Sequence, residues 1–165
     1  MIASVIHLRA VVRRTTELLL ILAMAVLVLD VLWGVVSRFV LGAQSRFTEE
    51  LATMLLIWVS LLGASLAYGS AQHLGVDYFV RKLHPDTHRL MQVVVALVVM
   101  AFAASVMVYG GMVLFTRTLD SGQVSPAMGL KMGYVYLVVP ISGALFILES
   151  LSSIVSPDVV ETTDG

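Results

Sequence analysis

The sequence predicts an all-α integral membrane protein with four transmembrane helices and a short interfacial amphipathic helix between helices two and three. Apolar residues make up 59% of the 165 residues and charged residues only 13%, against roughly 25% charged in an ordinary globular domain. Most of this excess lies in four apolar runs, each near the roughly 20 residues that a helix needs to cross a bilayer. The net charge of −1 gives no sign of a nucleic-acid partner. The lack of cysteine excludes disulfides and thiol-based catalytic, metal or iron–sulfur sites.

We expect a single membrane domain over residues 1–165. The second span is the clearest, because Leu51 to Ser70 contains no charged residue. At 1.5 Å per residue this run is roughly 30 Å long, which matches the hydrocarbon core of a bilayer. The approximate spans are residues 18–41, 51–70, 90–116 and 134–155.

The first span follows a basic lead-in with Arg9, Arg13 and Arg14. It is too long for the apolar region of a cleaved signal peptide and lacks a good small-x-small cleavage site. We therefore expect it to remain as a membrane helix.

Asp30 lies well inside this first run and shares one helix face with Gly34 and Arg38, at i, i+4 and i+8. A carboxylate at that depth is costly and usually points into a protein interface or cavity. Two interpretations are open: a proton or cation site, or a buried polar residue bonded to a neighbouring helix.

Charged residues gather where helix two begins. Thr48 is a candidate N-cap, and Glu49 and Glu50 would then occupy the first turn, where the helix dipole favours negative charge. We predict that both glutamates form a polar collar with Arg38 and Arg46, or pair with a partner protein. Neighbouring helical residues point about 100° apart, so we do not expect the two carboxylates to act as a catalytic pair.

Three small residues, Gly63, Ala67 and Ala71, recur at every fourth position of helix two. Small residues at this spacing let a second helix approach closely. We interpret this stripe as a contact within the bundle or with another membrane subunit.

Between helices two and three, apolar residues from Val76 to Leu83 follow a helical period, with Arg81 and Lys82 mostly off that face. This pattern predicts a short amphipathic helix in the interface, stopped by Pro85. All four histidines lie outside the predicted spans: His7, His73, His84 and His88. A haem-binding four-helix cytochrome would need histidine ligands within its helices, so this alternative is disfavoured.

Lys and Arg counts predict the orientation. The N-terminal segment and the second loop hold six of the ten Lys and Arg residues. With four spans, both termini would then be cytoplasmic.

One stretch contains Arg38-Phe39, Phe47, Glu49-Glu50, Trp58, Leu62-Gly63-Ala64, His73 and Val76-Asp77. A second contains residues 125–130, Tyr136 and Pro140. Together these stretches cover about half the chain and resemble the small permease subunit of tripartite ATP-independent periplasmic (TRAP) transporters. Phe47 stands where that family has Trp.

The resemblance implies an accessory, non-enzymatic subunit, without a cofactor or metal, in a bacterial inner membrane surrounded by lipid. It would brace a large, sodium-driven membrane subunit that imports a small organic acid, and it would help to dock a periplasmic substrate-binding protein. The alternative is a small proton-coupled exporter in which Asp30 is the coupling carboxylate.

Overall fold

The computed structural model describes residues 2–40, 42, 46–71 and 85–155. Its backbone forms four long helical rods, and each contains a segment long and apolar enough to cross a membrane. The predicted fold class is therefore confirmed. These segments are Arg9–Val40, Arg46–Ser70, Leu90–Asp120 and Met132–Ile154.

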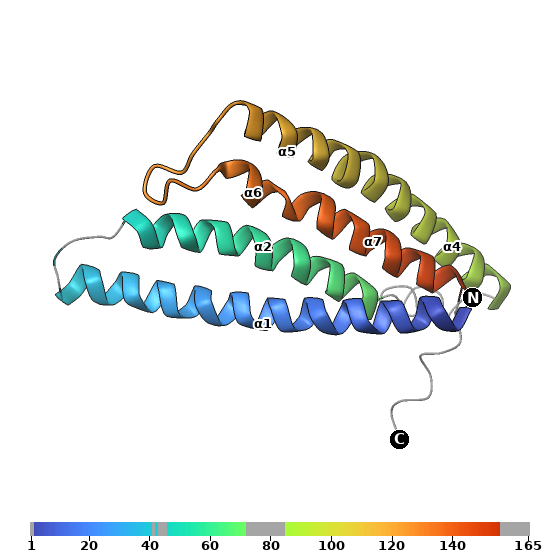
Figure 1. The fold of residues 1–165 in the computed structure, drawn as a ribbon. Coiled ribbons are helices and arrows are strands. Elements are labelled where there is room, and N and C mark those ends of the chain that lie inside the picture. Colours follow the sequence, from blue (N-terminus) through green and yellow to red (C-terminus); the bar gives the residue numbers. More distant parts are fainter. Residues whose placement is uncertain (1, 41, 43–45, 72–84, 156–165) are drawn as a thin grey trace, which may run out of the picture.

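The rods lie side by side in a different order from their order in the chain (Figure 1). The fourth rod packs between α2 and the third rod, and α1 lies at the edge against α2. The first two rods are α1 (Ile2–Val40) and α2 (Arg46–Ala71). The third comprises α4 (Pro85–Phe102), the π-helix η1 (Ala103–Gly110) and α5 (Gly111–Asp120); the fourth comprises α6 (Met132–Tyr136) and α7 (Val138–Val155).

The helix ends differ from the sequence-based expectations in three places. Helix α2 begins at Arg46, so Thr48 lies inside its first turn and the N-cap prediction is wrong. The third rod runs on to Asp120, four residues beyond the expected end at residue 116. The fourth rod is interrupted at Leu137, because Pro140 has no N–H to donate to the carbonyl four residues earlier.

Some expectations lie outside the described residues. The predicted amphipathic helix between helices two and three is among them, as are His73 and His84. The side chains of His7, Ala71 and His88 are likewise not described.

The buried side chains are mainly small or polar. Among the described residues, eleven polar or charged side chains are buried, against six apolar ones. Buried hydroxyls such as those of Thr16 and Ser142 donate to carbonyls three or four residues earlier in their own helix. Most large apolar side chains face outward, as expected for helices that lie in lipid and not in water.

Helix α7 and the third rod approach each other most closely at two glycines. A Cβ added to Gly143 would lie 2.7 Å from the Cβ of Met107 in η1. One added to Gly111 would lie 2.9 Å from the ring of Pro140. Ala103, at the start of η1, is fully buried. The absence of side-chain bulk at these positions sets the distance between the two rods.

Candidate functional site

The first polar contact links the start of α2 to the loop between α5 and α6. The Glu50 carboxylate accepts hydrogen bonds from the Ser125 hydroxyl and from the Ala127 backbone N–H, the latter at 3.1 Å to each carboxylate oxygen. The Ser125 hydroxyl also accepts a hydrogen bond from the Met128 N–H at 3.2 Å. The loop that connects the third and fourth rods is therefore held against α2, the second rod.

The loop has a defined conformation of its own. The Ser125 N–H donates to the carbonyl of Leu130 at 2.8 Å, and the Gly129 N–H donates to the carbonyl of Ser125 at 2.8 Å. Gly129 has a φ of 66°, which side chains other than glycine adopt at a cost. These bonds turn the chain tightly and present the Ala127 N–H to Glu50. Val124 and Leu130, which flank this turn, are about half exposed.

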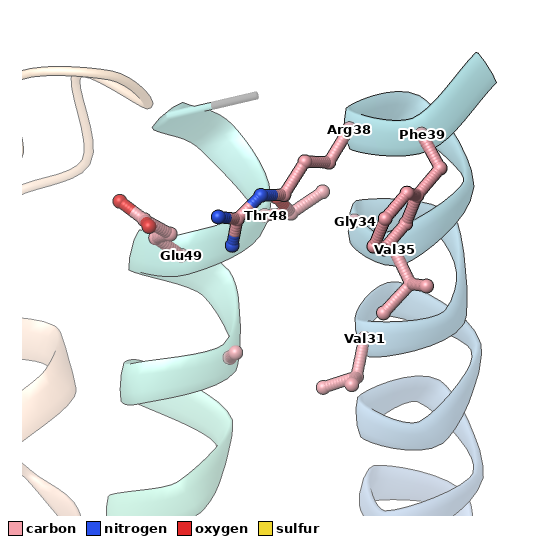
Figure 2. Close-up of a pocket in the computed structure, with 8 residues that line it drawn as sticks. Val31, Gly34, Val35, Arg38, Phe39, Thr48 and Glu49 are labelled. Atoms are coloured by element: carbon pink, nitrogen blue, oxygen red, sulfur yellow. The ribbon is translucent and has the colours of Figure 1, made fainter. Parts of the chain in front are cut away.

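The other residues of the predicted collar are not paired with one another. Within the described part of the chain, no ion pair joins Arg38 or Arg46 to Glu49 or Glu50. Figure 2 shows Arg38 reaching from α1 toward Thr48, whereas the Glu49 carboxylate lies on the side of α2 away from α1. The collar as a whole stays a prediction.

Asp30 lies on the face of α1 that packs against α2. It is 8% exposed, and its Oδ2 atom has no hydrogen-bond partner among the described residues. One turn farther along, Gly34 meets the Thr48 hydroxyl: a Cβ on Gly34 would lie 3.3 Å from Thr48 Oγ1. Asp30 is thus a buried acidic group in the seam between two helices.

The small-residue stripe of α2 is only partly within the bundle. A Cβ on Gly63 would meet the Leu20 side chain of α1 at 3.9 Å, an ordinary van der Waals distance. Ala67 is exposed. The role of the stripe as a contact with a second subunit stays a prediction.

The second polar contact lies at the opposite end of the bundle and was not expected from the sequence. Arg9 of α1 donates to Oε2 of Glu149 in α7 from two guanidinium nitrogens, at 2.9 and 2.6 Å. The Glu149 side chain is 7% exposed and that of Arg9 22%. A mostly buried carboxylate therefore has a cation beside it, which offsets the cost of removing it from water.

Helix α2 leaves space for this pair. A Cβ on Gly69 would lie 2.6 Å from the Glu149 carboxyl carbon, so only glycine fits without a shift. The neighbouring residues also join α2 to α7. The Ser150 hydroxyl hydrogen-bonds the Tyr68 hydroxyl at 3.2 Å, and the ring centroids of Tyr68 and Phe146 lie 5.3 Å apart. The sequence held one usable signal: with four spans, the start of the first helix and the end of the fourth lie on the same side of the membrane.

Comparison with known proteins identifies the family. Residues 27–158 match the family described as "Tripartite ATP-independent periplasmic transporters, DctQ component". The chain belongs to this family. The TRAP resemblance seen in the sequence is confirmed, and the protein is a TRAP transporter small permease subunit.

Individual relatives agree with this assignment. A Haemophilus influenzae protein whose name contains the words "TRAP transporter small permease protein" is 28% identical over 134 residues, covering 81% of each chain. The ectoine TRAP transporter small permease protein TeaB of Halomonas elongata is 27% identical over 153 residues, covering 87% of this chain and 77% of TeaB. The isethionate TRAP transporter permease protein DctMQ of Oleidesulfovibrio alaskensis is 27% identical over 113 residues, which cover 68% of this chain but 18% of that longer protein.

In this TRAP small permease subunit the two polar contacts act as fixed ties. Glu50 attaches a loop to α2 at one end of the bundle, and Arg9 with Glu149 joins α1 to α7 at the other. Both ties fix the positions of helices relative to one another.

Proposed function

We propose that this protein braces the large membrane subunit of a sodium-driven TRAP transporter that imports a small organic acid. Membership of the small permease family is the observation that carries the proposal. Support for the partner comes from DctMQ, where a region similar to this chain occupies a minor part of a much longer permease. A soluble periplasmic protein would deliver the substrate.

The distribution of charge supports an accessory role. A membrane site for an organic anion uses fixed cations or half-helix N-termini near the middle of the bilayer. The apolar stretches of the four rods, residues 18–37, 51–71, 90–116 and 132–148, contain one charged residue, Asp30, and it is acidic. Such a bundle offers packing surface for a carrier and no cationic site for a carboxylate.

We further propose that the loop held by Glu50 helps to dock the binding protein. The Lys and Arg count favours cytoplasmic termini, which would put this loop in the periplasm. Val124 and Leu130, which flank the turn, give it half-exposed apolar side chains on a hydrogen-bonded frame. Glu50→Gln should loosen the frame and weaken capture of the binding protein by the assembled transporter about tenfold, while Glu49→Gln, at an exposed position, should not. Equal capture by both variants would remove the loop from the docking surface.

Co-expression tests the bracing role. An affinity tag on this chain should recover a co-expressed large TRAP membrane subunit from detergent-solubilised membranes in a fixed ratio. Reporter fusions after Pro126 and at Gly165 should lie on opposite sides of the membrane. Recovery of this chain without any large membrane subunit would contradict the bracing role, and fusions on one side would contradict the topology.

One observation favours the alternative of a proton-coupled exporter, namely the buried Oδ2 of Asp30 without a hydrogen-bond partner among the described residues. In that case, cells that express only this chain should export a toxic cation, and Asp30→Asn should abolish export. We expect no export from either form.

A further inference from the structure

A cavity of about 230 Å³ opens between the last turns of α1 and the first turns of α2. Apolar side chains of α1, those of Val31, Val35 and Phe39, form one wall, and Arg38 lies at its upper end (Figure 2). Thr48 and Glu49 line the α2 side. One wall of the cavity is therefore apolar, and Arg38 gives its upper rim a positive charge.

Arg38 has no partner among the described residues that would hold it in place. No hydrogen bond or ion pair joins its guanidinium to another residue in the described part of the chain, and the side chain is exposed. It lies two residues from the end of the membrane-spanning segment Arg9–Val40. An arginine at that depth extends its charged end to the headgroup level while its stem lies along apolar surface.

The vertical order of these groups matches one class of ligand. Val31 lies seven residues before Arg38, so about 10 Å of helix separates the charged rim from the lower apolar wall. A glycerophospholipid has its phosphate and its upper acyl carbons in the same order and over a similar depth. A soluble anion would leave the apolar wall uncovered.

We propose that this cavity is a specific phospholipid site, with the phosphate bound by Arg38 and one acyl chain along Val31 and Val35. The planar guanidinium suits bidentate contact with a phosphate. Glu49 lines the α2 side, but its carboxylate points away from α1, so Arg38 is the charged group that meets a headgroup here. Phosphatidylethanolamine and phosphatidylglycerol should therefore both bind through the phosphate. The site requires only that the chain spans a membrane.

Native mass spectrometry of the delipidated full chain, together with its large subunit where the two assemble, measures this binding directly. The probes are the two phospholipids, added in increasing amounts, with inorganic phosphate as a competitor. Arg38→Gln should weaken retention of phosphatidylethanolamine about tenfold, because hydrogen bonds to charged groups change affinities on that scale. Arg46→Gln is the matched control, since Arg46 is exposed nearby but does not line the cavity.

A second pair of variants fills the cavity without touching Arg38. Val35→Trp should reduce retention to a similar extent, while Val36→Trp, at an equally exposed position outside the cavity, should not. Equal retention by all four variants would overturn the proposal. Displacement of the lipid by millimolar phosphate would also overturn it, since it would indicate a site for a soluble anion. If the large subunit assembles and the complex takes up no lipid, protein covers the cavity and the proposal fails.

Discussion

Helices α1 and α7 are both apolar and both long enough to cross a membrane, yet they occupy opposite environments. Helix α7 packs against α2, α4 and η1, and three of its side chains, Val138, Ser142 and Ser150, are fully buried. Helix α1 packs mainly against α2, and side chains such as Leu22 and Leu29 are more than 60% exposed.

Hydrophobicity does not decide which helix is central. In lipid, apolar side chains gain little free energy when they move from the acyl chains into a helix interface. Close packing and hydrogen bonds therefore determine helix association. Helix α7 has small residues where other helices cross it, above all Gly143. On α1 the buried face also carries small or polar residues, fourteen and then seven positions apart at Thr16, Asp30 and Ser37, while the large apolar residues face outward.

The largest effect should come from added bulk on α7. Gly143→Leu would place side-chain atoms where the Cβ of Met107 and the backbone N of Val108 already lie, at 2.7 and 3.2 Å from even a bare Cβ. We expect a loss of about 3 kcal/mol or more in unfolding free energy, and little folded protein. Ala144→Leu is the control, because Ala144 is exposed on the same helix. The yield of monodisperse protein in detergent measures both, and equal yields would mean that α7 is not closely packed here.

The tie between α1 and α7 should come next. Arg9→Gln leaves the buried Glu149 carboxylate without its cation and should lower the unfolding free energy by about 3 kcal/mol. Arg13→Gln breaks the exposed pair with Glu17, at 2.9 Å, and should cost about 0.5 kcal/mol.

Denaturant titration in mixed micelles measures both arginine variants. Adding Glu149→Gln to Arg9→Gln should restore part of the loss, because the buried negative charge is then gone. No recovery in the double variant would show that the pair does not couple the two helices.

Two glycines of α2 give a smaller contrast. Gly69→Ala should cost about 1–2 kcal/mol, because its Cβ would push Glu149 away from Arg9. Gly63→Ala should be neutral or slightly stabilising, since 3.9 Å from Leu20 is ordinary contact and alanine is the better helix former. Thermal unfolding of the two variants provides the comparison. A larger loss of stability in Gly63→Ala than in Gly69→Ala would mean that the small-residue stripe forms the tightest contact of α2.

The smallest effect should be on the outer face of α1. Leu29 is 66% exposed, so Leu29→Ala should change the unfolding free energy of the isolated chain by less than about 0.5 kcal/mol. A loss of several kcal/mol would mean that α1 is as enclosed as α7. The same variant in the assembled transporter shows whether this face meets lipid or the large subunit.

The sequence was sufficient for the fold class, because apolar runs and their lengths depend only on composition along the chain. It also singled out Glu50 as a member of the charged group at the start of helix two. It did not predict that Glu50 contacts Ser125, because that contact depends on the conformation of the loop around Ser125. Gly69 and Gly143 were missed because a glycine becomes essential only where the register of two helices brings them together. The π-helix η1 has no marker that we recognise in its sequence, and the N-cap assigned to Thr48 was wrong by most of a turn, because α2 begins at Arg46.

Uptake by reconstituted liposomes tests the accessory role most directly. Liposomes that contain this chain and the large subunit, supplied with the binding protein, its organic-acid substrate and an inward sodium gradient, should accumulate the substrate. Liposomes that contain this chain without the large subunit should show only background leakage. Sodium-driven uptake by this chain with the large subunit left out would contradict the bracing role and make Asp30 the first residue to examine as a coupling site.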